Sequence, residues 1–121
     1  MKPLGKHLLI ELNNCDTEVL KDLTHLEKAM NRSAKAGGAN IVDSNFHAFS
    51  PYGISGVIII KESHLTIHTW PEHQYAAVDL FSCSGKIDAD KIIAVLKEEL
   101  MAENVIIEDV ERGYGTSRNK S

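Results

Sequence analysis

The segment from residue 40 to residue 83 contains four strand-like stretches in a row with only turns between them. The stretches are residues 40–50, 55–61, 63–70 and 75–83. Pro51-Tyr52-Gly53 and the Pro71 step mark two of the turns. Strands with such short connections pair as hairpins, and hairpin partners run antiparallel. The sequence therefore predicts an antiparallel meander at the centre of the chain.

Helical patterns flank this meander on both sides. Before it, we expect a strand over residues 6–12 and one helix that starts at Asp16 or Thr17 and stops at Gly37-Gly38. After it, we expect a second helix and a last strand over residues 104–110. The inward positions of the two helices are Val19, Leu20, Leu23, Leu26, Met30 and Ala34, then Ile92, Ile93, Leu96 and Leu100. The predicted class is α+β, a two-layer sandwich of a mainly antiparallel sheet with two helices on one face.

The composition is that of one globular domain. The chain has 121 residues, 43% hydrophobic and 25% charged. We expect a single domain over residues 1–112 and a mobile polar tail over 113–121. The net charge of −4 argues against nucleic-acid binding, and no stretch has the pattern of a signal peptide or a membrane span. Cys15 and Cys83 are therefore expected to be free thiols in the cytoplasm.

Two of the central strands differ in their patterns. SGVIIIK, residues 55–61, has apolar residues in succession, so we expect it to be buried on both faces. Residues 63–70 alternate instead. One face of this strand carries His64, Thr66 and His68, and the other carries Leu65, Ile67 and Thr69.

The stretch KESHLTIHTWPEHQ, residues 61–74, is dense in histidine, and two ordinary explanations fail. His64 and His68 stand about 13 Å apart on a strand, so they cannot share a metal ion, and we predict no metal site. A serine hydrolase triad of Ser63, His68 and Asp79 lacks the usual nucleophile turn, and Ser63 and His68 point to opposite faces of one strand.

Longer motifs carry a resemblance over nearly the whole chain. They are LGKH at 4–7, FHAFSPYGISGV at 46–57, KESHLTIHTWPE at 61–72, YAAVDLFSC at 75–83 and Glu-Arg-Gly at 111–113. Together they resemble the S-adenosylmethionine decarboxylase proenzymes of the prokaryotic type. The resemblance implies a carboxy-lyase that releases CO2 from S-adenosylmethionine. Its product, S-adenosyl 3-(methylsulfanyl)propylamine, supplies aminopropyl groups for spermidine synthesis.

The resemblance also implies a cofactor made from the chain itself. Cleavage between Glu62 and Ser63 would give a β chain, 1–62, and an α chain, 63–121, and would convert Ser63 into a pyruvoyl group. This carbonyl forms a Schiff base with the substrate amine and takes up the electrons that decarboxylation releases. Serine suits this conversion because its hydroxyl can attack the preceding carbonyl to form an ester, which then leaves by β-elimination.

Roles for the other site residues are carried over from the family's motifs. By resemblance, His68 accepts the Cα proton of residue 63 during processing and Ser55 assists, while Cys83 donates a proton during turnover. Phe49 would stack on the adenine and Glu72 would bind the ribose hydroxyls. Glu11, which interrupts the first strand, is a further candidate for substrate binding.

Two alternative functions stay open from the sequence. Relatives on the same scaffold are pyruvoyl-dependent decarboxylases of arginine or ornithine, and they keep the serine, histidine and cysteine. Phe49 and Glu72 favour the adenosyl substrate. The second alternative is a homologue that never processes Ser63 and serves a metal-binding or structural role.

The opposed directions of Ser63 and His68 predict a homodimer with shared active sites. In longer relatives two halves resembling this chain are fused, and the equivalents of Phe49, Ser55, His68 and Glu72 lie in one half, with those of Ser63 and Cys83 in the other. Here the two halves would be two processed protomers. A dimer would also cover the sheet face that the two helices leave bare.

Overall fold

The computed structural model describes residues 3–113. Six strands form one sheet in the order β2-β3-β4-β5-β1-β6, and every neighbouring pair is antiparallel. The strands are β1 (Gly5–Asn13), β2 (Ile41–Ala48), β3 (Ile54–Ile60), β4 (Ser63–Trp70), β5 (Tyr75–Ser82) and β6 (Asn104–Arg112). The helices are α1 (Thr17–Leu20), α2 (Leu23–Ala36) and α3 (Ala89–Glu99), with a 3-10 turn η1 (Pro71–His73). The predicted meander β2–β5 and the α+β class are confirmed.

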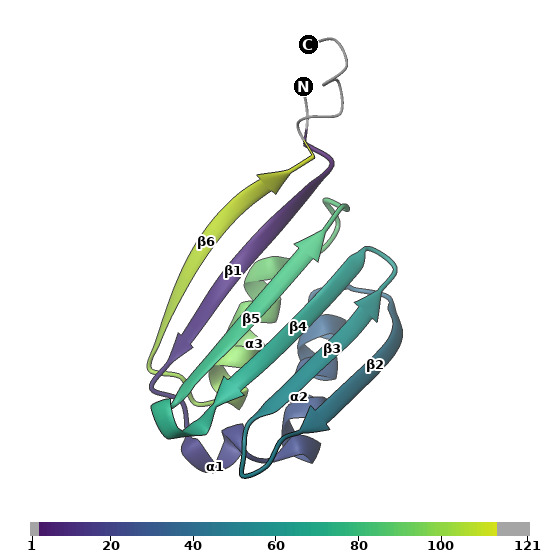
Figure 1. Ribbon diagram of the computed structural model, residues 1–121. Coiled ribbons are helices and arrows are strands. Elements are labelled where there is room, and N and C mark those ends of the chain that lie inside the picture. The colour runs from purple at the N-terminus through teal and green to yellow at the C-terminus, as the bar shows by residue number, and fades with distance from the viewer. Residues whose placement is uncertain (1–2, 114–121) are drawn as a thin grey trace.

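The two long helices lie on one face of the sheet (Figure 1). The core lies between these layers. Its largest fully buried side chains are Ile10, Leu12, Leu20, Leu26, Met30, Ile54, Ile58, Leu65, Ile67, Ile92, Leu96 and Leu100. The predicted alternation of residues 63–70 is confirmed, because Leu65, Ile67 and Thr69 are buried on the helix side. None of the described helices has the length and apolar character needed to cross a membrane.

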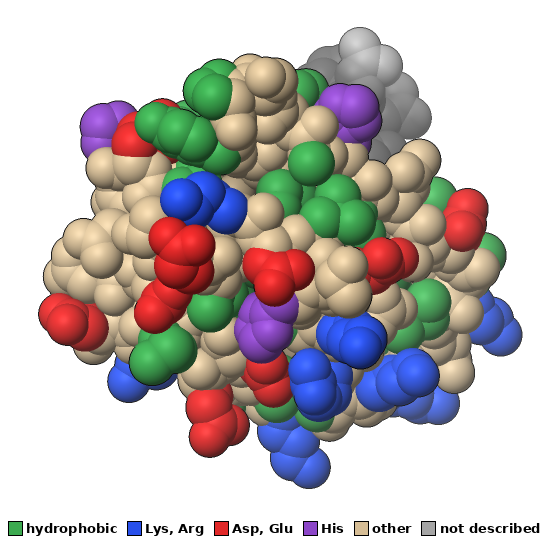
Figure 2. Space-filling model, turned by 90° about the horizontal axis from the view of Figure 1, so that it is seen from below, with side chains coloured by type: hydrophobic (Ala, Val, Ile, Leu, Met, Phe, Trp, Pro, Cys, Tyr) green, Lys and Arg blue, Asp and Glu red, His purple; other side chains and the backbone are tan. Residues whose placement is uncertain are grey.

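The sheet face opposite the helices is open, as expected when two helices cover only one face. Register places Ser55, Val57 and Ile59 of β3 beside His68, Thr66 and His64 of β4 on this face. Several large apolar side chains are exposed in or beside it: Phe49 (51%), Ile59 (47%), Trp70 (40%) and Ile106 (60%). Figure 2 views the lower end of the molecule, where most Lys and Arg side chains lie in the lower half of the picture and acidic side chains are interspersed.

The structure corrects two expectations. The single helix expected before Gly37 is two helices, because α1 ends with Lys21 as its C-cap and Asp22 begins the next helix as its N-cap. The Asp22 carboxylate accepts a hydrogen bond from the backbone N–H of His25 at 3.1 Å. The second concerns residues 55–61, which are not buried on both faces. Ile59 points to the open face and is 47% exposed. The expected tail of 113–121 falls outside the described residues from position 114 onward.

Candidate active site

The β3–β4 connection and the end of β5 bring the first group of predicted residues together. The carbonyl oxygen of Glu62 accepts two hydrogen bonds from Cys83, one from the backbone N–H at 3.1 Å and one from the thiol at 3.1 Å. Cys83 directly follows β5, which pairs with β4. Two donors therefore converge on the carbonyl of the peptide bond between Glu62 and Ser63.

Ser63 begins β4 with an unusual backbone conformation. Its φ is 154°, a positive value that residues other than glycine seldom adopt. It pairs with Ile60 across the hairpin and with Ser82 of β5. Strand alternation assigns it to the same face as Leu65, which points toward the helices. We call Glu62, Ser63 and Cys83, the residues at and around the predicted cleavage bond, the cleavage half-site.

The carboxylate of Glu62 is held from a second side. It accepts hydrogen bonds from the backbone N–H of Asn40 at 3.2 Å and from the Asn40 side-chain amide at 2.7 Å. These bonds lower the pKa of Glu62 below its ordinary value. Both the carbonyl and the carboxylate of this residue are therefore bonded to other parts of the chain.

A second group of predicted residues lies on β3 and β4 further along the hairpin. Ser55 and His68 are register partners, and Ser55 Oγ lies 2.8 Å from His68 Nδ1. On the buried face, the Thr69 hydroxyl accepts from the Ile54 backbone N–H and donates to the Leu20 carbonyl, each at 2.9 Å. When His68 Nδ1–H donates to Ser55, its Nε2 lone pair is free to accept a proton.

A cavity of about 270 Å³ adjoins this serine–histidine pair. Phe49, from the β2–β3 loop, and Glu72, from η1, both line it. Phe49 is 51% exposed, and its ring meets that of His47 edge-on at 4.5 Å, so much of the ring is available to a ligand. We call Phe49, Ser55, His68 and Glu72 the histidine half-site.

Glu11 is linked to this cavity through two aromatic residues. Its carboxylate accepts a hydrogen bond from the Tyr75 hydroxyl. Partial burial and this bond raise the pKa of Tyr75 to about 12, so the hydroxyl keeps its proton. The Tyr75 ring stacks on Trp70 at 5.3 Å, and Trp70 lines the cavity. Glu11 therefore contacts the cavity only indirectly, through Tyr75 and Trp70.

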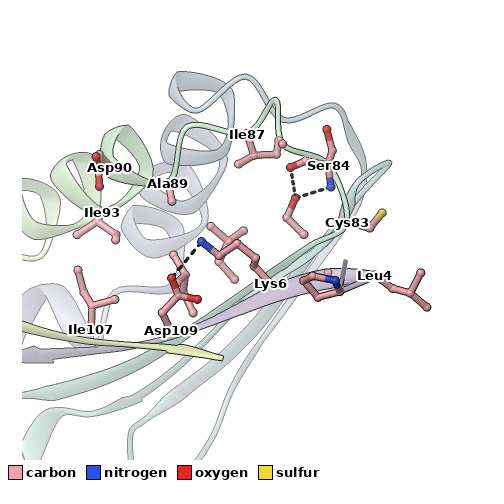
Figure 3. Close-up of a pocket in the computed structure, with 16 residues that line it drawn as sticks. Leu4, Lys6, Cys83, Ser84, Ile87, Ala89, Asp90, Ile93, Ile107 and Asp109 are labelled. Carbon is pink, nitrogen blue, oxygen red and sulfur yellow. Dashed lines mark hydrogen bonds and ion pairs between the residues drawn. The ribbon is translucent and has the colours of Figure 1, made fainter. Parts of the chain in front are cut away.

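A larger cavity of about 570 Å³ lies between α3 and the β1–β6 edge of the sheet (Figure 3). Cys83 and Leu4 lie at one end and Ile107 toward the other, and the Cys83 thiol points away from α3. Lys6 Nζ and Asp109 Oδ2 form an ion pair at 3.1 Å beside it. The cavity meets the cleavage half-site at Cys83, whereas the residues that line it include no member of the histidine half-site.

The two half-sites are separate within one chain. Ser63 and His68 are five positions apart on β4, roughly 17 Å at the rise of a strand, and they belong to opposite faces. The alternative triad is not assembled either, since His68 bonds to Ser55 while Asp79 lies 3.9 Å from His7 Nε2. Among residues 3–113, no three His, Cys, Asp or Glu side chains are grouped to hold a metal ion.

The sequence reading missed Asn40, Trp70 and Tyr75. Asn40 contacts a residue 22 positions away, so no local spacing marks it. Trp70 and Tyr75 lie inside recognised motifs, and their shared face could be read from strand pairing. Their stacking depends on side-chain conformations that a sequence pattern does not specify.

Comparisons with known proteins identify the family. The family model for S-adenosylmethionine decarboxylase matches residues 6–113. The chain belongs to the S-adenosylmethionine decarboxylase family. The S-adenosylmethionine decarboxylase proenzyme of Thermotoga petrophila is 51% identical over 113 residues, covering 93% of this chain and 87% of its own. That of Thermodesulfovibrio yellowstonii is 46% identical over 120 residues, covering 99% and 89%.

Solved structures agree on the fold. The crystal structure of the adenosylmethionine decarboxylase from Aquifex aeolicus superposes with a TM-score of 0.85 at 28% identity, covering 93% of each chain. The AdoMetDC-delta26 monomer of Trypanosoma brucei, at 16% identity and a TM-score of 0.61, shares the fold. This chain covers 44% of that longer one.

Membership in this family establishes the overall activity of the chain. The chain is a proenzyme of an S-adenosylmethionine decarboxylase, a polyamine-biosynthetic enzyme whose pyruvoyl cofactor forms from a serine of the chain. The cleavage half-site fits this chemistry, because a serine follows a carbonyl that two hydrogen-bond donors polarise. A hydroxyl next to an activated carbonyl is what an intramolecular acyl shift requires.

Proposed function

We propose that Ser63 is the serine that becomes the pyruvoyl group, by cleavage of the Glu62–Ser63 bond. The Ser63 hydroxyl oxygen attacks the Glu62 carbonyl carbon, the C–N bond breaks, and the proton passes to the released amine, leaving an ester. Removal of the Cα proton of residue 63 breaks the Cβ–Oγ bond by β-elimination and releases the new C-terminal, main-chain carboxylate of Glu62. The resulting dehydroalanine takes up water and loses ammonia. The support for this bond is the pair of 3.1 Å contacts from Cys83.

Those two contacts have a specific use in the first step. Attack on the carbonyl carbon places negative charge on the Glu62 oxygen. The Cys83 backbone N–H and thiol already point at that oxygen, so they stabilise the charge as it develops without rearrangement. In turnover, the pyruvoyl group supplies the electron sink, and the Cys83 thiol donates the proton that replaces the departing carboxylate.

His68 accepts the Cα proton, with Ser55 holding its imidazole. The 2.8 Å contact between Ser55 Oγ and His68 Nδ1 fixes the ring and leaves Nε2 to act. The chain's own Ser63 is out of reach, being roughly 17 Å along the strand and on the other face. The base that serves Ser63 therefore comes from a second copy of the chain.

The active enzyme in this account is a homodimer with two shared sites. Each site combines one protomer's cleavage half-site with the other's histidine half-site, in an isologous arrangement. The open sheet face supports this, since Ile59, Trp70 and Ile106 expose large apolar surfaces on it. The longer Trypanosoma chain, of which this chain covers 44%, shares the fold and also fits a fused counterpart.

The histidine half-site would bind the adenosyl part of the substrate. Phe49 offers an exposed ring for the adenine and Glu72 a carboxylate for the ribose hydroxyls, beside the 270 Å³ cavity. Glu11 contributes by holding Tyr75 and thus Trp70. Both cysteines are free thiols, which fits a reducing compartment such as the cytoplasm.

Intact mass spectrometry and CO2 release test this proposal together. We expect fragments 1–62 and 63–121, the second carrying a pyruvoyl end, and CO2 from adenosylmethionine but not from arginine or ornithine. Cleavage at another bond would refute the assignment of Ser63. Release of CO2 from a basic amino acid alone would refute the roles given to Phe49 and Glu72.

A further inference from the structure

Asn40 occupies a rigid position between α2 and β2. The end of α2 is closed by a Schellman motif, in which Gly38 N–H donates to the Lys35 carbonyl and Ala39 N–H to the Ala34 carbonyl, both at 3.0 Å. Gly38 has a φ of +81°, the left-handed conformation this motif needs. The residue that follows, Asn40, therefore leaves the helix in a defined direction.

Three hydrogen bonds connect Asn40 to the β3–β4 connection. Its backbone N–H and side-chain amide donate to the two oxygens of the Glu62 carboxylate, at 3.2 and 2.7 Å. Its carbonyl accepts from the Lys61 backbone N–H at 2.8 Å. Two donors on the two oxygens of one carboxylate make a bidentate, charge-assisted contact, which restrains orientation as well as distance.

We propose that Asn40 is a positioning residue for self-cleavage, which clamps Glu62 so that its carbonyl stays on Cys83 and within reach of the Ser63 hydroxyl. The inference rests on the proposed cleavage of the Glu62–Ser63 bond. Cys83 holds the carbonyl of Glu62, and Asn40 holds its carboxylate and the preceding peptide. With both ends held, the connection cannot rotate the carbonyl away from its two donors.

The effect should fall on the acyl shift, before the ester forms. An error of about 1 Å in the position of a reacting group can cost about a hundredfold in rate. Asn40→Ala removes the 2.7 Å side-chain bond to the Glu62 carboxylate and keeps the two backbone bonds. Because the carboxylate is then held on one oxygen only, cleavage should slow by about ten- to a hundredfold. His68→Ala, by contrast, removes the base that acts after the ester has formed.

Hydroxylamine separates these two steps. It attacks the ester carbonyl, forms a hydroxamate at Glu62 and releases the Ser63 hydroxyl, so it cuts only chains that have completed the acyl shift. We expect hydroxylamine to cleave His68→Ala readily and to leave Asn40→Ala largely intact over the same time. Equal hydroxylamine sensitivity of the two variants would overturn the proposal, because Asn40 would then act after the acyl shift or not at all.

Exchanging the amide and the carboxylate between residues 40 and 62 tests their contact even if Asn40→Ala destabilises the fold. Asn40→Asp alone places two carboxylates together and should cleave more slowly than Asn40→Ala. Combining Asn40→Asp with Glu62→Gln restores an amide–carboxylate pair in the opposite sense, and should recover most of the lost rate. If the double variant is no faster than Asn40→Asp alone, the contact does not position the scissile bond.

Asn31→Ala is the matched control, because this asparagine also donates from its side chain, to the Glu27 carbonyl at 2.8 Å, but on α2. It should cleave at the wild-type rate. Mass spectrometry of the wild-type fragments reports on the cleavage site itself. If the wild type is cleaved between Glu62 and Ser63 and folded Asn40→Ala is cleaved at the normal rate, the role of Asn40 is refuted. The assignment of the cleavage site would not be affected.

Discussion

The two half-sites are built in different ways. In the cleavage half-site the contacts come from backbone and side chains of segments distant in sequence, with Glu62 held by Cys83 and Asn40 at the end of the sheet. In the histidine half-site, Ser55 and His68 face each other as register partners in the middle of two paired strands. The cleavage half-site lies at the end of the hairpin, and the histidine half-site faces outward from the open sheet. This difference supports the proposal that each half-site is completed by a second copy of the chain.

The same difference extends to what surrounds each half-site. The larger cavity, about 570 Å³, meets Cys83 from the helix side, whereas the smaller one, about 270 Å³, lies beside Phe49 and Glu72. In the proposed account, the acyl shift and the proton donation in turnover belong to the cleavage half-site, whereas the processing base and adenosyl recognition belong to the histidine half-site. Substitutions in the two half-sites should therefore impair different steps of processing, turnover or substrate binding.

The largest effect is expected from Ser63→Ala. This variant has no hydroxyl to attack the Glu62 carbonyl, so it should remain a single chain of full length and release no CO2. Intact mass after prolonged incubation measures this. A cut between residues 62 and 63 in this variant would mean that a contaminating protease, and not the chain, breaks the bond.

His68→Ala should stop processing at a later step. The acyl shift needs only the cleavage half-site, so the ester should form but not eliminate. We expect an uncut chain that hydroxylamine divides at position 62–63. Ser55→Ala, which keeps the imidazole but loses its 2.8 Å contact, should show a milder form of the same defect. Normal processing of His68→Ala would remove this residue from the mechanism.

Cys83→Ala should affect both stages, and turnover more than cleavage. The backbone N–H still donates to the Glu62 carbonyl, so cleavage should continue at a reduced rate. Loss of a positioned proton donor should lower CO2 release per cleaved chain by about a hundredfold or more. Cys15→Ala is a matched control, because that thiol is buried and donates to the Leu12 carbonyl, which belongs to neither half-site. Unchanged turnover in Cys83→Ala would contradict its role.

Phe49→Ala should weaken substrate binding without blocking cleavage. Stacking of a base on an aromatic ring is worth about 1–3 kcal/mol, so KM for adenosylmethionine should rise while processing continues. Phe49→Tyr keeps a ring in the same place and should retain a KM near that of wild type. An unaltered KM in Phe49→Ala would show that the adenine binds elsewhere.

Glu72→Gln should have the smallest effect, about 1 kcal/mol, because the amide oxygen still accepts hydrogen bonds but without a charge. The informative measurement compares substrates with and without a ribose hydroxyl in both enzymes. If Glu72 binds the ribose, removing the hydroxyl should cost less in Glu72→Gln than in wild type. Equal costs in the two enzymes would separate Glu72 from the ribose.

Much of this architecture could be predicted from the sequence, because the local pattern of apolar and polar residues determines which elements form and which faces they bury. The alternation in residues 63–70 gave the faces of β4 correctly, because one face of the strand is buried and the other is not. The same reasoning failed for Ile59, since a run of apolar residues does not show that one side of the strand is open. The break at Asp22 was missed because the apolar spacing continues through the capping residue.

For the candidate site, the sequence motifs name residues, whereas the contacts among them come from the structure. The motifs identified Ser55 and His68, and strand pairing then brings them to 2.8 Å. The bonds from Asn40 to Glu62 depend on how the end of α2 meets a hairpin 22 residues later, and no spacing rule contains that information. Sequence patterns give the least information about contacts between loops that are distant in sequence.

Mixed dimers test most directly whether each active site needs both half-sites from different chains. Ser63→Ala and His68→Ala should each remain uncut alone. When the two are co-expressed with different tags and the mixed dimers are isolated, the intact Ser63 of one chain should meet the intact His68 of the other. The shared-site account predicts that the His68→Ala chain is cut and the Ser63→Ala chain is not, with one competent site per dimer. Isolated mixed dimers in which neither chain is cut would contradict it.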